Sequence, residues 1–147
     1  MIWFVDSSAL VKRYVKETGS VWLRSEIVKN EVLISQLTPV EISAALGRKY
    51  RRGVISKFVF YQARRILVYH LNGQQYKVIN LSQRIVNEAF RLTFERSLRA
   101  YDAVQLASAL IASARFDLSR FVFITADSDL EAAAQAEGFQ TDNPLAH

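Results

Sequence analysis

Short apolar segments alternate with longer amphipathic segments along the whole chain. The run Met1–Val5 is apolar without alternation and too short for a helix, which indicates a parallel strand buried on both faces. Three further segments have the length and composition of strands, and a polar segment near the end suggests an edge strand. These segments are Val32–Ser35, Tyr76–Leu81, Arg120–Thr125 and the edge segment Gln140–Thr141.

Apolar residues recur at helical spacing between the predicted strands. Thr38 followed by Pro39 predicts a helix start, and Gly53 predicts its end. Alternating strands and helices imply an α/β fold, with a parallel sheet covered by helices on both faces. No linker or repeat divides the 147 residues, so we expect a single domain over 1–147. The predicted helices are Ser8–Tyr14, Ser20–Lys29, Thr38–Arg52, Ser56–Leu71, Ser82–Arg96, Ala100–Ser113 and Ser128–Glu137.

Composition narrows the chemistry. The absence of cysteine excludes disulfides and thiolate metal sites, and two histidines, His70 and His147, give little basis for a zinc site. Hard, oxygen-preferring cations such as Mg²⁺ or Mn²⁺ remain. The net charge of +5 favours a polyanionic partner, although ordinary solubility explains it as well. No apolar stretch approaches the ~20 residues of a membrane span, and no secretory signal is evident, so we expect a cytoplasmic protein.

Four carboxylates stand where a predicted strand ends or an apolar helix begins. Asp6 ends the first strand, and Asp127 follows the strand that ends at Thr125. Glu41 and Asp102 open two apolar helical stretches. Because ligands of parallel α/β sheets bind at the carboxyl ends of the strands, Asp6 and Asp127 are expected at that edge.

Asp6 and Glu41 also have structural interpretations. Asp6 can cap the helix that follows, although Ser7 or Ser8 could take that role and leave Asp6 free. Thr38 and Glu41 have the spacing of a capping box, which would not prevent Glu41 from facing the sheet edge.

Asp127 and Asp102 have alternatives of the same kind. Asp127 can cap the next helix, unless Ser128 and Glu131 form a capping box there. Asp102 shares a helix face with mostly apolar residues, and burying a carboxylate costs several kcal/mol unless it is paired. Its partner could be a bound cation, Arg99 or backbone amides of the first helical turn.

Together these positions place several like charges at one edge of one sheet. Their repulsion would be costly without a cation between them. Mg²⁺ is typically held by one or two carboxylates together with waters and phosphate oxygens. Such an ion lowers the pKa of a bound water and neutralises charge on a phosphate. The sequence therefore favours a metal-dependent phosphodiesterase.

Four segments in order along the chain resemble the PIN-domain family, and most of all the VapC-type toxins of prokaryotic toxin–antitoxin pairs. The resemblance implies a three-layer α/β/α sandwich around a mainly parallel sheet. It also implies a Mg²⁺- or Mn²⁺-dependent endoribonuclease that leaves 5′-phosphate and 3′-hydroxyl ends. The segments are Val5–Lys12, Thr38–Leu46, Arg99–Ala107 and Phe123–Leu130.

The resemblance assigns the catalytic, metal-binding site to Asp6, Glu41, Asp102 and Asp127, with Asp129 as the alternative at the fourth position. On this hypothesis the three aspartates hold the ion, and Glu41 binds it or polarises the water that attacks the RNA. The implied partners are an RNA substrate, a second copy of the chain, and a small VapB-like antitoxin that blocks the site.

Basic and aromatic residues suggest where these partners bind. Arg48, Lys49, Arg51 and Arg52 form a cluster that could guide RNA, or an ordinary solvated helix surface. The aromatic residues of Phe58–Tyr61, with Tyr69, fit core packing or a contact with an antitoxin or a second copy.

Three other functions remain open at this stage. One is a PIN ribonuclease of RNA processing or decay, and another is an inactive PIN-like scaffold. The third is a phosphate-accepting receiver domain. Receivers need paired acids after the first strand, whereas Asp6 is followed by Ser7 and Ser8, so this alternative is disfavoured.

Overall fold

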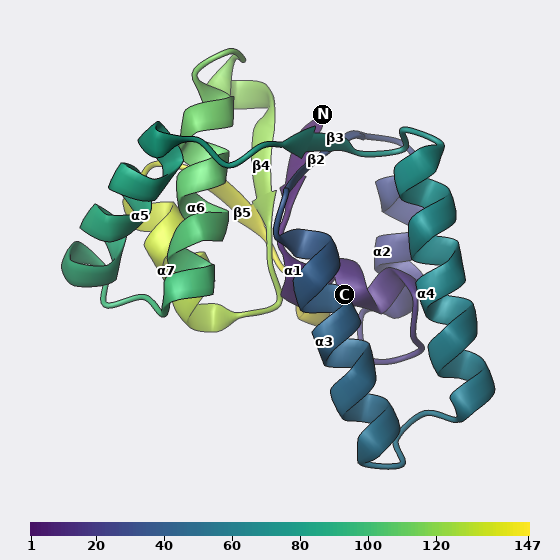
Figure 1. The fold of residues 1–147 in the computed structure, drawn as a ribbon. Helices are drawn as coiled ribbons and strands as arrows, with labels where there is room; N and C mark the ends of the chain where they lie inside the picture. The colour runs from purple at the N-terminus through teal and green to yellow at the C-terminus, as the bar shows by residue number, and fades with distance from the viewer.

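The structure, a computed structural model that describes all 147 residues, is a three-layer α/β/α sandwich (Figure 1). Five strands form one sheet in the order β3-β2-β1-β4-β5, and every neighbouring pair is parallel. The predicted fold class is therefore confirmed. The strands are β1 (Ile2–Val5), β2 (Glu31–Ser35), β3 (Lys77–Ile79), β4 (Phe121–Ile124) and β5 (Gln140–Asp142).

Helices cover both faces of this sheet (Figure 1). One face carries α1 to α4, and the other carries α5, α6 and α7. Three short 3₁₀ segments, Val11–Arg13, Leu118–Arg120 and Pro144–Ala146, complete the chain. The helices are α1 (Ser7–Leu10), α2 (Ser20–Ile27), α3 (Thr38–Arg51), α4 (Lys57–Asn72), α5 (Gln83–Glu95), α6 (Ala100–Ser113) and α7 (Ser128–Ala136).

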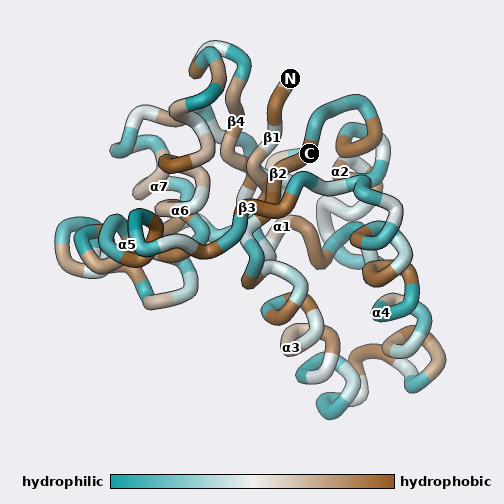
Figure 2. Tube along the Cα trace, turned by 45° about the horizontal axis from the view of Figure 1, so that its top comes forward, coloured by the Kyte–Doolittle hydropathy of each residue, from teal (hydrophilic) through white to brown (hydrophobic).

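The apolar run at the start of the chain is buried on both sides, as predicted. Phe4 packs into the core beneath α5, α6 and α7, whereas Trp3 and Val5 pack into the core beneath α1 to α4. Figure 2 shows hydrophobic colour along the central strands β1 and β2. Because β1 lies in the middle of the sheet, the residue that follows it lies at the centre of the sheet edge.

Two predicted elements differ in the structure. The helix expected over Ser8–Tyr14 is a single turn, α1, followed by the 3₁₀ segment. The third strand, Lys77–Ile79, is shorter than predicted, and the preceding Tyr76 is a buried side chain whose hydroxyl lies 2.5 Å from that of Tyr14. The predicted break at Gly19 is confirmed. Its φ is +84°, and a Cβ there would lie 2.4 Å from the carbonyl oxygen of Pro144.

Helices α3 and α4 run side by side and extend beyond the sheet (Figure 1). On α4 only Ala63 and Leu67 are buried. The interpretation of its aromatic residues as core is therefore wrong for Phe58, Tyr61 and Tyr69, which are 74%, 55% and 69% exposed. None of the helices in the structure has the length and hydropathy that crossing a membrane requires.

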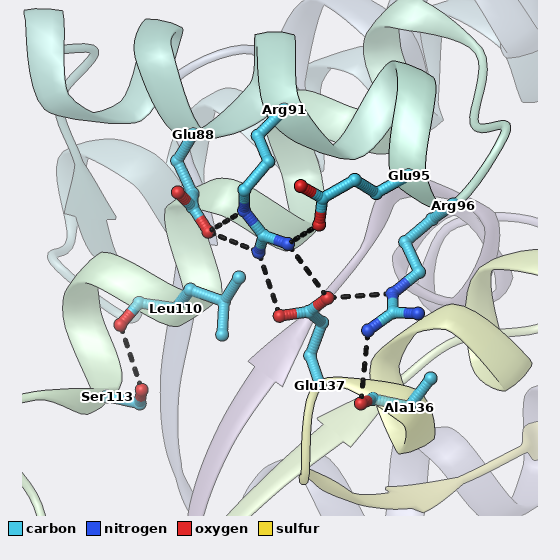
Figure 3. Close-up of polar contacts among 8 residues, drawn as sticks. All are labelled: Glu88, Arg91, Glu95, Arg96, Leu110, Ser113, Ala136 and Glu137. Carbon is cyan, nitrogen blue, oxygen red and sulfur yellow. Dashed lines mark hydrogen bonds and ion pairs between the residues drawn. The ribbon is translucent and has the colours of Figure 1, made fainter.

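On the face of the sheet that carries α5, α6 and α7, an ion-pair network joins α5 to the end of α7 (Figure 3). The Arg91 guanidinium lies 2.5 Å from Glu88, 2.5 Å from Glu95 and 2.9 Å from Glu137. Arg96 lies 2.7 Å from the same Glu137 carboxylate. This network fixes α5 against α7 and leaves these charges satisfied by one another.

Candidate active site

Asp6 lies at the carboxyl end of β1 and is 2% exposed. Its Oδ1 accepts hydrogen bonds from the Ala9 amide at 3.1 Å and the Ser8 hydroxyl at 2.9 Å, so Asp6 caps α1. Burial raises the pKa of Asp6 to about 7, and hydroxyl and amide donors only partly oppose that increase. Both of these hydrogen bonds end on Oδ1 of the carboxylate.

Ser8 connects the ends of β1 and β4. Its hydroxyl donates to Asp6, accepts from the Ala126 amide at 2.9 Å and lies 3.3 Å from the Thr125 hydroxyl. The suggestion that Ser7 or Ser8 caps the helix is wrong, because Asp6 is the N-cap of α1 and the Ser8 hydroxyl donates to it. Thr125 accepts from the Asp127 amide at 3.1 Å, as expected of a hydroxyl that orients this edge.

Asp127 caps α7. Its Oδ1 accepts from the amides of Asp129 and Leu130 at 2.9 and 3.0 Å. The alternative capping box is wrong, because Glu131 instead accepts from Thr141 and from Asn143. The cap occupies Oδ1 of Asp127 and leaves Oδ2 to face other partners.

Asp102 lies in the first turn of α6 and is half-buried. Burial raises its pKa, Arg99 lowers it, and the negative charges of Asp127 and Asp129 raise it further. Arg99 Nε lies 3.2 Å from Asp102 Oδ2, and Arg99 Nη2 lies 3.4 Å from Asp127 Oδ2. One guanidinium therefore already stands between these two carboxylates.

Glu41 does not take part in the predicted capping box. Thr38 is buried inside the first turn of α3 and has no capping hydrogen bond, because its hydroxyl is paired with Gln105 of α6. The Gln105 amide nitrogen also donates to Glu41 Oε2. Burial raises the pKa of Glu41, Gln105 and Ser7 lower it by hydrogen bonding, and the charge of Asp102 raises it.

A cavity of about 380 Å³ collects these groups at the sheet edge. All four predicted carboxylates line it, although they come from chain segments far apart in sequence. Arg48, Arg99 and the exposed Tyr101 also line it, whereas Asp129 does not. Of the predicted basic cluster, Lys49 is instead paired with Glu17 at 2.7 Å.

The donor set of this cavity fits a hard divalent ion held by few ligands. No three histidine, cysteine, aspartate or glutamate side chains are placed to hold one ion, so the carboxylates form no closed cage. Mg²⁺ needs only one or two carboxylates, because waters and substrate phosphate complete its shell. Asp102 and Asp127 fit that smaller set, since their Oδ2 atoms already flank one cationic group.

Sequence reasoning missed Gln105 and the supporting role of Ser8. Gln105 is 1% exposed and is the buried amide of the otherwise small or apolar stretch of α6 that follows Asp102. That isolated amide was the signal that could have identified it. Ser8 gave no such signal, because serine is common at helix starts.

Comparisons with known proteins agree with this architecture. The family model described as "PIN domain" matches residues 3–136. None of the curated proteins that were compared matches the chain. Solved structures do match it over almost its whole length.

The structure of PAE2754 from Pyrobaculum aerophilum is 24% identical, with a TM-score of 0.64 over 96% of this chain and 89% of that one. A toxin–antitoxin complex from Klebsiella pneumoniae is 19% identical, with a TM-score of 0.65 over 96% of each chain. Mycobacterium tuberculosis VapC20, a toxin that cleaves the sarcin–ricin loop, is 17% identical, with a TM-score of 0.64 over 93% and 95%. At these identities the similarities show a shared fold.

Proposed function

This chain belongs to the PIN domain family, and we propose that it is a Mg²⁺- or Mn²⁺-dependent endoribonuclease, the toxin of a type II toxin–antitoxin pair. One observation carries the nuclease part of this proposal. Four carboxylates from β1, α3, α6 and the start of α7 line one cavity together with two arginines. Buried carboxylates with raised pKa values at a cavity are typical of catalytic sites.

Each carboxylate has a separate role in this proposal. Asp102 and Asp127 hold the divalent ion, and Asp6 supplies a further oxygen. When bound, the ion lowers the pKa of water and neutralises charge on the phosphate. Glu41 accepts the proton of the attacking water, because a carboxylate with a raised pKa is a stronger base than an exposed glutamate.

The supporting side chains hold these carboxylates in place. Gln105 and Ser7 both hydrogen-bond to the Glu41 carboxylate and hold it at the edge of the cavity. Ser8 fixes Asp6 against the end of β4. Arg48 and Tyr101 line the same cavity, so a phosphate and a base of RNA would meet a cation and an aromatic ring there.

RNA cleavage by the purified protein tests the nuclease proposal. We expect Mn²⁺-dependent cleavage of labelled RNA, abolished by chelator and restored by added metal. Asp6→Asn, Glu41→Gln, Asp102→Asn and Asp127→Asn should each slow cleavage by about 100-fold or more. Asp129→Asn is the matched control, because this exposed neighbour lies outside the cavity. An Asp6→Asn protein as fast as wild type, or activity that survives chelation, would refute the assignment.

The proposed protein partners are a VapB-like antitoxin and a second copy of the chain. Structural neighbours include the toxin–antitoxin complex from Klebsiella pneumoniae, which supports an antitoxin partner. On α4, a groove lined by Phe58, Tyr61 and Arg65 offers an apolar helix a place to pack. On α5, Phe90 and Phe94 are 81% and 89% exposed, which suits the contact with a second copy.

Sedimentation of the isolated chain tests the second of these partners. We expect a dimer that Phe90→Glu dissociates and Phe58→Glu leaves intact. A monomer at high concentration would count against the homodimer without affecting the nuclease proposal.

A further inference from the structure

Arg99 occupies an unusual position at the candidate active site. It is the N-cap residue of α6, and its side chain makes no capping hydrogen bond. Its guanidinium instead contacts Oδ2 of both Asp102 and Asp127, at 3.2 and 3.4 Å, and the three residues line the same cavity. The side chain is nevertheless 83% exposed, so packing does not hold it there.

We infer that Arg99 competes with the divalent ion for Asp102 and Asp127, and that it moves to the substrate phosphate when the ion binds. The inference rests on the proposed function, because it concerns the same site. On Asp127 the cap takes Oδ1, so Arg99 contacts the oxygen that remains, and on Asp102 the Arg99 guanidinium is the side-chain partner of Oδ2. A guanidinium and a divalent ion on the same oxygens would repel each other, so binding the ion requires Arg99 to withdraw.

The contacts of Arg99 are weak enough to be exchanged. Both are long for charged hydrogen bonds, and exposed ion pairs contribute little to stability. Arg91 shows the opposite case in the same protein: its side chain is 32% exposed and contacts three glutamates at 2.5 to 2.9 Å (Figure 3). Arg91 is therefore fixed, whereas Arg99 can leave its carboxylates at small cost.

The released guanidinium has a destination in the same cavity. Guanidinium groups bind phosphate through two parallel hydrogen bonds, and Arg99 lines the space in which the substrate phosphate would lie. Metal binding then frees a phosphate ligand, and phosphate binding draws Arg99 away from the metal's oxygens. By linkage, each ligand should strengthen the binding of the other.

Calorimetric titration of the purified chain with Mn²⁺ alone tests the competition. We expect Arg99→Gln to bind Mn²⁺ about 3- to 10-fold more tightly than wild type, because two weak ion pairs no longer compete. Arg48→Gln is the matched control: it removes the same charge from the same cavity, and Arg48 forms no ion pair with these carboxylates. Its affinity for Mn²⁺ should change less than about 2-fold.

Three results would overturn the inference and leave the proposed metal dependence in place. Equal affinity in wild type and Arg99→Gln would show that Arg99 does not compete. Weaker binding by Arg99→Gln would show that Arg99 positions the carboxylates. An equal gain in Mn²⁺ affinity in Arg99→Gln and Arg48→Gln would show that the effect comes from removing any positive charge from the cavity. If no variant bound Mn²⁺, the proposed metal dependence would fail, and the inference with it.

The phosphate step has its own measurement. Fluorescence anisotropy of a short labelled RNA, with Ca²⁺ as the hard cation, gives the increase in RNA affinity that the cation causes. We expect the increase in RNA affinity caused by Ca²⁺ to be at least about 3-fold larger in wild type than in Arg99→Gln. The same increase in both proteins would show that Arg99 does not move to the phosphate.

Discussion

Replacing Asp6 by asparagine should slow cleavage by about 100-fold or more and yet make the protein more stable. Burial raises the pKa of Asp6 from its ordinary value of 3.8 to about 7. At about 1.4 kcal/mol for each unit of pKa, ionising Asp6 costs the folded state at most about 4 kcal/mol at pH 8. Asparagine carries no charge to bury, and its side-chain oxygen can still accept from Ala9 and Ser8.

The sign of the pH dependence follows from the direction of this change. Because the folded state holds the Asp6 proton more tightly than the unfolded state, the wild-type protein loses stability as pH rises from about 4 to 7. The loss is complete above pH 7. The Asp6→Asn protein should not show it, so its advantage grows with pH, from under about 2 kcal/mol at pH 5 to at most about 4 kcal/mol at pH 8.

Urea unfolding in chelator at pH 5 and pH 8 measures this difference for wild type, Asp6→Asn and the exposed-site control Asp129→Asn. We expect only Asp6→Asn to gain stability with pH relative to wild type. Adding Mn²⁺ should then stabilise wild type more than Asp6→Asn, because the ion offsets the buried charge. If Asp6→Asn were less stable than wild type at pH 8, burial would not be the main influence on Asp6.

Three further predictions concern other parts of the molecule. Gln105→Leu should lower kcat about 10-fold with little change in KM. Because the Gln105 hydrogen bond lowers the pKa of Glu41, its removal should raise that pKa and shift the acidic limb of the pH profile to higher pH. An unchanged profile would exclude a positioning role. Tyr101→Ala should weaken RNA binding about 5- to 100-fold in an anisotropy assay while Tyr101→Phe retains it, if a base stacks on the ring. Glu137→Gln should lower the free energy of unfolding by about 1–2 kcal/mol in urea, because Arg91 and Arg96 lose their shared partner; equal stability would make this network dispensable.

The sequence alone determined most of the framework. The pattern of apolar residues located the strands and the longer helices, because a segment buried on both faces and one with a single apolar stripe leave different patterns. It also placed Asp6 and Asp127 at one edge, since the carboxyl ends of parallel strands point the same way. The four carboxylates that line the cavity are those selected from their positions along the chain.

Only the tertiary structure decided which partners these groups have. Local spacing predicted a capping box for Glu41, but its partner is Gln105, 64 residues away along the chain. The sequence left the aromatic residues of α4 open between core packing and a partner contact, and only the structure shows that Phe58 and Tyr69 are 74% and 69% exposed. Arg99 reaches Asp127 only because α6 and α7 begin at the same edge. Local rules compare neighbours in sequence, whereas burial and pairing depend on segments that meet only after the chain has folded.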